Sequence, residues 1–282
     1  MAHHRLLAGF VFGFVLLGCA NNSDVLSKPA EEISLENSAD ASNRSSDNAS
    51  DGALGEADED VKVEGLAEGP VARWLLDDLQ PDAVVPDSVG DADGVLIGGA
   101  ATTDRNGREG GALNLDGDDH VEIDHNASLD LTNDFSIAAW IQYRPQAIQD
   151  TWYTVFEKSD PERGGHSRWG IWIRDDRLWV CYETADNSRQ PCGIAEDPIP
   201  ADGSWHHITG VRAGNQATLW VNGEMAGEVL VDRSEISRSS FLSFIGTDTY
   251  GEAPVWLDAA LDDIQIYDRA LDQVEIRSLA DS

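Results

Sequence analysis

From Val71 to Tyr267, apolar and polar residues alternate with a period of two, in segments of about four to eight residues bounded by Gly, Asp, Asn and Pro. This is the period of a half-buried β-strand, because successive side chains point to opposite sides of a strand. Many short strands at close spacing are typical of sandwiches and jelly rolls. We therefore predict an all-β fold, a two-sheet antiparallel jelly-roll sandwich. The expected strands are Ala72–Leu76, Gly94–Ile97, Ala112–Leu115, His120–Ile123, Phe135–Tyr143, Tyr153–Lys158, Trp169–Arg174, Arg177–Tyr182, His206–Arg212, Ala217–Val221, Glu224–Leu230, Phe241–Ile245 and Leu261–Tyr267.

Two turns predict which strands pair. Asn222-Gly223 favours a type I′ hairpin, because both central residues of that turn need a positive φ. A two-residue turn at Asp175-Asp176 predicts that Trp172 faces Trp179 on one side of the sheet. On the other side, toward the core, it pairs Ile173 with Leu178, Ile171 with Val180 and Trp169 with Tyr182. Only Ala270 to Ala280 has the pattern of a helix, and we expect a short C-terminal one there.

The composition divides the chain into three parts. Residues 1–18 contain an apolar run after Arg5 that is too short to span a bilayer and is typical of an export signal. Residues 19–69 are rich in Asn, Ser, Ala, Glu and Asp and contain almost no aromatic or β-branched residues to bury, so we expect a disordered, acidic tether. All nine Trp lie between Trp74 and Trp256, which indicates one folded domain over residues 70–282.

The export signal ends in Leu16-Leu17-Gly18-Cys19. A small residue followed directly by Cys resembles the lipobox of bacterial lipoproteins, which implies that cleavage leaves Cys19 as a lipidated, palmitate-bearing N-terminus. Ala20, in place of an Asp, implies the outer membrane of a Gram-negative bacterium by the same resemblance. The alternative is an ordinary secretory signal in which Cys19 is incidental.

The formal net charge is −33, from 52 acidic and 19 basic residues. This balance repels phosphate backbones and anionic headgroups, so it excludes nucleic acid as a partner and leaves the lipid as the membrane attachment. With Cys19 lipidated, Cys181 and Cys192 remain in an oxidising compartment. A disulfide between them would stabilise a hairpin by about 3 kcal/mol, and two unpaired thiols are the alternative.

Several short segments follow one another in a characteristic order. They are Trp74-Leu75-Leu76-Asp77-Asp78, Asp87-Ser88-Val89-Gly90, Asp93-Gly94, Gly110 to Gly117, Val121-Glu122-Ile123, Phe135 to Ile141, Trp205 to Val211, Leu219 to Gly223 and Leu261 to Leu271. Together they cover most of residues 70–282 and resemble the LamG-like jelly-roll domains of the concanavalin A-like lectin/glucanase superfamily. The resemblance implies two packed antiparallel sheets, one of them concave, in modules that mostly bind carbohydrate or protein.

Retaining glucanases of this superfamily carry Glu-x-Asp-x-Glu, or the same motif with one more spacer, on one strand. That spacing places nucleophile and acid on the same face. Here Glu122-Ile123-Asp124 is followed by His125, Asn126 and Ala127, so the second Glu is missing. We therefore expect no enzymatic activity, with a glycoside hydrolase as the alternative.

A structural calcium site is the metal hypothesis. Asp262 has the parity of Ile264 and Ile266, so on a regular strand it would point toward the core, where an unpaired carboxylate is costly. By resemblance to calcium sites of the superfamily, the ion would be shared with Asp77 or Asp78 and with carbonyl groups near Gly111. The alternative is that Asp262 accepts backbone N–H bonds in a turn.

The remaining candidates are aromatic. Trp172 and Trp179 could stack against sugar rings, or they could be a cross-strand packing pair beneath a loop. His206 and His207 point to opposite sheet faces and cannot chelate one metal together, so we expect one half-buried and one solvated.

The sequence as a whole predicts a surface-anchored, noncatalytic binding module for a carbohydrate or a partner protein, in a monomer. A structural or adhesive envelope protein is a further alternative. We expect specificity to lie in loops such as Gln146–Trp152, Ser159–Arg168 and Ala185–Pro191.

Overall fold

The structure is a computed structural model that describes residues 68–77, 83–98, 101–102, 111–160, 166–186, 190–248 and 254–282. By its contacts the chain divides into Met1–Lys62 and Val63–Ser282, and every described residue belongs to the second unit. The expected signal, Cys19, most of the tether and Asp78 lie outside the described residues. Within the described ranges, no helix is both long enough and apolar enough to cross a membrane.

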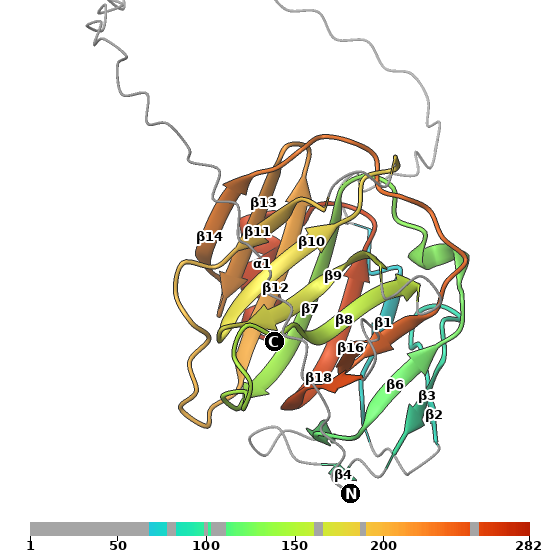
Figure 1. Ribbon diagram of the computed structural model, residues 1–282, viewed down its shortest axis with the longest axis vertical. Coiled ribbons are helices and arrows are strands. Elements are labelled where there is room, and N and C mark those ends of the chain that lie inside the picture. The colour runs from blue at the N-terminus through green and yellow to red at the C-terminus, as the bar shows by residue number, and fades with distance from the viewer. Residues whose placement is uncertain are drawn as a thin grey trace, which may run out of the picture. The chain divides into compact units, whose positions relative to one another are not determined.

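Two packed antiparallel sheets form the fold, as predicted, and each has eight strands among the described residues. Sheet A has the order β14 (Glu224–Leu230), β13 (Gln216–Val221), β12 (His206–Ala213), β7 (Phe135–Tyr143), β18 (Asp258–Tyr267), β5 (Leu113–Asp116) and β4 (Ala101–Thr102), with β1 (Ala72–Trp74) paired to β18. Sheet B has the order β11 (Cys192–Ile194), β10 (Arg177–Tyr182), β9 (His166–Arg174), β8 (Tyr153–Asp160), β15 (Ser243–Ile245), β6 (His120–Ile123), β3 (Gly94–Ile97) and β2 (Val84–Val85). Figure 1 shows β10, β9 and β8 of sheet B crossing in front of β12, β7 and β18 of sheet A.

In the part of the chain that the structure describes, four elements lie outside the two sheets. They are the strands β16 (Thr247–Asp248) and β17 (Val255–Trp256), which form a small ribbon, a 3₁₀ turn η1 (Ala127–Leu129) and a helix α1 (Gln273–Ala280). Five of the observed strands were not predicted: β2, β4, β11, β16 and β17. Each has only two or three residues, which is too short for a period of two to be recognised.

The core lies between the sheets and is filled by the inward-facing residues of both. Its centre is a row of aromatic rings, in which Phe156 stacks on Trp74 and Trp169 with centroid distances of 5.5 Å and 5.3 Å. The buried indole N–H groups donate to main-chain carbonyls, that of Trp74 to Ala92 at 2.9 Å and that of Trp169 to Leu129 at 3.2 Å. The core therefore buries the large rings without leaving these donors unsatisfied.

Both predicted hairpins are confirmed. Asp175 and Asp176 have φ values of 51° and 62°, and Asn222 and Gly223 have φ values of 51° and 74°, the left-handed pair that a type I′ turn requires. The turn at Asp175 sets the register of β9 and β10 as expected, so that Trp172 lies opposite Trp179.

The helix is also where the sequence predicts it, although it begins three residues later. Asp272 caps it by accepting hydrogen bonds from the backbone of Val274 and Glu275, and the Glu275 side chain accepts from the Asp272 backbone N–H. The helix packs through Ile276 on a small apolar cluster with Val211, Trp220, Tyr267 and Leu271, which covers part of the outer face of sheet A.

The expectation that Asp262 faces the core is wrong. A bulge interrupts β18 between Asp262 and Gln265, and Asp263 has a φ of 48°. As a result Leu261 and Ile264, three residues apart, both point into the core with no exposed surface. The extra residue reverses the alternation, so Asp262 lies on the outer face of sheet A together with Ala260.

Candidate functional site

Three tryptophans gather on the outer face of sheet B, and we call Trp152, Trp172 and Trp179 the tryptophan cluster. Trp172 and Trp179 lie on this face because their neighbours Ile171, Ile173, Leu178 and Val180 all point into the core. Trp152 comes from the loop before β8, and its ring meets Trp179 edge to face at 5.1 Å and Trp172 at 6.4 Å. Such contacts stabilise aromatic clusters beyond the area they bury.

The three rings differ in what they offer to a ligand. Trp172 is only 3% exposed, and its Nε1 donates to Glu157 Oε2 at 2.9 Å. Its face is therefore not available to a sugar ring, and the prediction that Trp172 itself is a stacking platform is wrong. Trp152 and Trp179 are half-buried, so they are the part of the cluster that reaches the surface.

The loop that carries Trp152 is held in place by hydrogen bonds at both ends. The Gln146 amide donates to the main-chain carbonyl of Asp258 at 2.8 Å and accepts from the Asp258 N–H at 3.2 Å. Tyr153 Oη donates to the Ile148 carbonyl at 3.1 Å, and the Asp150 N–H donates to Asp175 Oδ1 at 2.7 Å. The position of Trp152 is therefore set before any ligand arrives.

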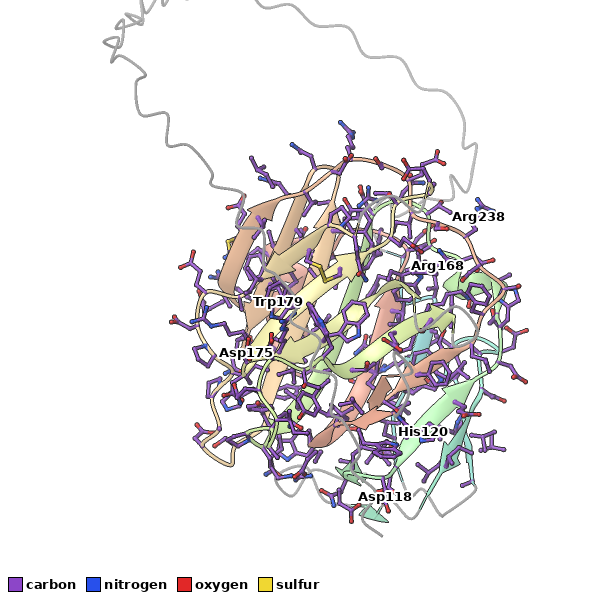
Figure 2. The ribbon with its side chains drawn as sticks, in the orientation of Figure 1. Asp118, His120, Arg168, Asp175, Trp179 and Arg238 are labelled. Atoms are coloured by element: carbon purple, nitrogen blue, oxygen red, sulfur yellow. A yellow bond between two sulfur atoms is a disulfide. The ribbon has the colours of Figure 1, made fainter. Side chains whose placement is uncertain are left out.

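Charged side chains surround the tryptophan cluster, and Figure 2 labels Trp179 with Asp175 below it at the β9–β10 turn. The Arg174 guanidinium lies 4.9 Å from the Trp152 ring centroid, which is a cation–π contact. It also forms an ion pair with Asp150. On the far side of the turn, Tyr143 donates to Asp176, and burial together with this carboxylate raises the pKa of the Tyr143 phenol.

A pair of carboxylates across sheet B would favour hydrolysis, so their placement is informative. Glu122 and Glu157 lie in one row, separated by Phe244 on β15, with Cα atoms about 9.6 Å apart for two strand spacings. Glu122 is exposed, but Glu157 has no exposed surface and accepts hydrogen bonds from Thr154 and Trp172. Glu157 therefore serves to hold Trp172 and does not meet solvent. Glu183, which directly follows β10, is buried in an ion pair with Arg168.

The described residues of the predicted calcium set, Asp77, Gly111 and Asp262, lie on β18 or next to the two strands that pair with one of its edges. β1 and β5 pair with the same edge of β18, at Trp74↔Ile264 and Leu113↔Leu261. Asp262 lies between these two strands, Asp77 follows β1, and Gly111 precedes β5. Carboxylate and carbonyl oxygens are suitable calcium ligands, so the site stays a prediction although its original premise, a core-facing Asp262, is wrong.

Three other acidic side chains lie close enough together to hold a metal ion. Among the described residues, the carboxylates of Asp116, Asp118 and Asp119 lie within 4.8 Å of one another, in the turn between β5 and β6. The close group of three carboxylates in the described residues is therefore not the predicted calcium set.

The two neighbouring histidines are both buried, so the expectation that one is solvated is wrong. His206 is 6% exposed and contacts Asp202 Oδ1 at 3.0 Å and Asn222 Nδ2 at 2.9 Å. His207 is 2% exposed and packs edge to face on Trp140 at 5.3 Å. The prediction that the two side chains point to opposite faces is confirmed, since His206 pairs with the core residue Ile141 and His207 with the outward-facing Trp140.

Cys181 and Cys192 are joined by a disulfide. They lie directly opposite each other on β10 and β11, with Trp179 two residues before Cys181 on the same face. The disulfide therefore fixes the edge of sheet B next to the tryptophan cluster.

Residues 115–277 match a protein-family model described as the concanavalin A-like lectin/glucanases superfamily. The chain belongs to this superfamily. A comparison of the concanavalin A-like chain with curated proteins found no match.

Solved structures of low sequence identity share the fold. The binding domain of Paraclostridial Mosquitocidal Protein 1 aligns with a TM-score of 0.59 and 18% identity, over 75% of this chain and 52% of that one. The binding domain of botulinum neurotoxin DC, solved with rat synaptotagmin II, aligns with a TM-score of 0.58 and 14% identity, over 76% and 51%. The concanavalin A-like chain thus spans about half the length of these toxin domains.

Domain 4 of AbnA, an extracellular arabinanase of Geobacillus stearothermophilus, was solved with arabinotriose. It aligns with a TM-score of 0.55 and 21% identity, over 75% of this chain and 98% of that one. These neighbours are binding domains or a domain solved with a carbohydrate, and at such identities the likeness establishes the fold alone.

Trp152 was not singled out from the sequence, although its loop was predicted to carry specificity. The signal available was a tryptophan at the end of a polar loop directly before a strand. Nothing local indicates that this ring reaches Trp179, because residues 152 and 179 meet only once β8, β9 and β10 are paired.

Proposed function

We propose that the concanavalin A-like domain is a noncatalytic binding module that binds carbohydrate at Trp152 and Trp179. The observation that carries this proposal is the half-buried pair of indole rings, 5.1 Å apart, among charged side chains on the outer face of sheet B. Indole rings bury the apolar faces of sugars, and neighbouring polar groups bind their hydroxyls.

Two further features support a binding role. The loop of Trp152 is held by Gln146 and Tyr153, and such preorganisation reduces the entropy lost when a ligand is bound. A similar domain, from an arabinanase, was solved with arabinotriose. Against a hydrolase, Glu157 is buried in hydrogen bonds to Thr154 and Trp172, so it does not form a solvent-accessible acid pair with Glu122.

A protein partner is the second candidate. Ile148 is 63% exposed in the same loop as Trp152, which suits a protein contact better than a sugar hydroxyl. The botulinum neurotoxin DC binding domain was likewise solved with a protein, rat synaptotagmin II.

The test is a glycan array followed by isothermal titration calorimetry with Trp179→Ala and Trp152→Ala. Trp256→Ala is the matched control, because Trp256 is also half-buried but lies in β17, outside the tryptophan cluster. Stacking on an aromatic ring contributes about 0.5–1.5 kcal/mol, so each cluster variant should weaken binding roughly 2- to 13-fold while the control does not. Trp179→Phe should retain part of the affinity. Equal affinities for wild type and both cluster variants, with unchanged thermal unfolding, would refute the proposal.

For the N-terminal part we propose that Cys19 carries lipid and anchors the module to the outer membrane of a Gram-negative bacterium. The support is the order of the apolar run, Gly18 and Cys19, together with the acidic composition of residues 19–69.

A further inference from the structure

We infer that the surface around Trp152 and Trp179 takes uncharged sugars and discriminates against sugars that carry a carboxylate. This inference rests on the proposed function and specifies the ligand class of the same site. It is drawn from the side chains that border the two rings.

The carboxylates are the outermost charged groups at this surface. The Asp150 side chain is 80% exposed and that of Asp175 is 51% exposed, whereas that of Arg174 is 28% exposed. Both acids are tied to the Trp152 loop, since the Asp150 N–H donates to Asp175 Oδ1 at 2.7 Å. A ligand that approaches Trp152 therefore meets carboxylate oxygens before it meets the guanidinium.

The nearest cation is already engaged. Arg174 forms an ion pair with Asp150, its Nε lies 3.9 Å from Asp175 Oδ2, and its plane covers the Trp152 ring at 4.9 Å. Releasing it to a ligand carboxylate would break these three contacts. Arg177 lies opposite Arg174 across the hairpin and is exposed, but it follows directly on Asp175 and Asp176, so these three consecutive residues together carry a formal charge of −1.

Carboxylates distinguish the two ligand classes by hydrogen bonding as well as by charge. An ionised Asp is an acceptor only, and the primary alcohol of a hexose can donate to it. In the corresponding uronic acid that donor is replaced by a second acceptor with a negative charge. Each Asp at about 8 Å then weakens binding roughly 2.4-fold in water, so the pair weakens it about six-fold at low salt. The net charge of −33 acts in the same direction.

The experiment uses the full-length chain and pairs of oligosaccharides that differ only in oxidation at C6, for example cellotetraose and its β-1,4-linked tetraglucuronate, or α-1,4-linked galactotetraose and tetragalacturonate. Dissociation constants are measured by calorimetry in 20 mM and 200 mM NaCl. At low salt we expect the neutral oligosaccharide to bind at least about six-fold more tightly than its charged counterpart, and we call this ratio of dissociation constants the gap. The gap should narrow at high salt, because added ions screen exposed charges.

The Asp150→Asn/Asp175→Asn variant keeps oxygen acceptors at both positions, leaves Arg174 without either of its carboxylates and leaves Arg177 with Asp176 as its acidic neighbour. It should close the gap or reverse it. Asp116→Asn/Asp118→Asn is the matched control, since it removes the same charge from exposed residues in the β5–β6 turn and should leave the gap in place.

A uronate that binds wild type as tightly as its neutral counterpart, at a site sensitive to Trp179→Ala, would overturn this inference and leave the proposed function standing. If neither class binds, and the glycan array also gives no ligand, the proposed function fails and the inference fails with it.

Discussion

Breaking the Cys181–Cys192 disulfide should lower the free energy of unfolding by about 3 kcal/mol. The two cysteines are 11 positions apart in the sequence, and the loop-entropy relation for a cross-link of this length gives about 3 kcal/mol at 25 °C. A domain of this size loses about 2–4 °C of Tm per kcal/mol, so the expected fall is roughly 6–12 °C. Since the bond joins β10 to β11 beside Trp179, ligand binding should weaken as well.

The assay is urea unfolding followed by tryptophan fluorescence, on oxidised wild type, on reduced wild type and on Cys181→Ala/Cys192→Ala. The reduced protein changes no residue, whereas the double alanine variant leaves no thiol to form dimers. Both should lose a similar amount of stability if the cross-link acts on the unfolded chain. A loss below about 1 kcal/mol in both proteins would contradict the loop-entropy reasoning.

Three further predictions concern other parts of the chain. The folded state raises the pKa of the Tyr143 phenol, so the unfolded chain loses this proton at a lower pH than the folded one. The neutral phenol therefore stabilises the fold below pH 10, and this stabilisation is lost as the pH rises above 10. Tyr143→Phe should therefore make the free energy of unfolding fall less steeply between pH 9.5 and 11 in urea titrations. If Asp77, Asp262 and the Gly111 carbonyl hold calcium, EDTA should lower Tm in wild type and not in Asp262→Asn, and an unchanged wild-type Tm would argue against the site. Cys19→Ser should abolish incorporation of labelled palmitate and release the protein from the membrane fraction, whereas continued labelling would place the lipid elsewhere.

Much of the sheet structure followed from local sequence. The register of β9 and β10 could be derived from Asp175-Asp176, because a two-residue turn fixes every pair along the hairpin. Parity also placed Trp172 and Trp179 together on one face. Parity gave the wrong face for Asp262, because the bulge at Asp263 inserts one residue into β18. The pattern of apolar residues in the sequence does not predict this bulge.

The candidate site was predicted only in part. Parity placed Trp172 and Trp179 on one face, but it could not show that Trp172 is covered, because its partners are Trp152 from a separate loop and Glu157 from β8. The burial of His206 and His207 also depends on distant partners, namely Asp202, Asn222 and Trp140.

The sequence by itself determined the all-β class, the strands long enough to show a period of two, the two-residue turn at Asp175-Asp176 and the type I′ turn at Asn222-Gly223. These depend on φ preferences and on alternation between neighbouring residues, which act over a few positions. The tertiary structure alone decided which rings are covered, where the bulge reverses a strand, and that Asp150 and Arg174 border Trp152. Those features arise from contacts between strands far apart in the chain, whose geometry is fixed only when the two sheets pack.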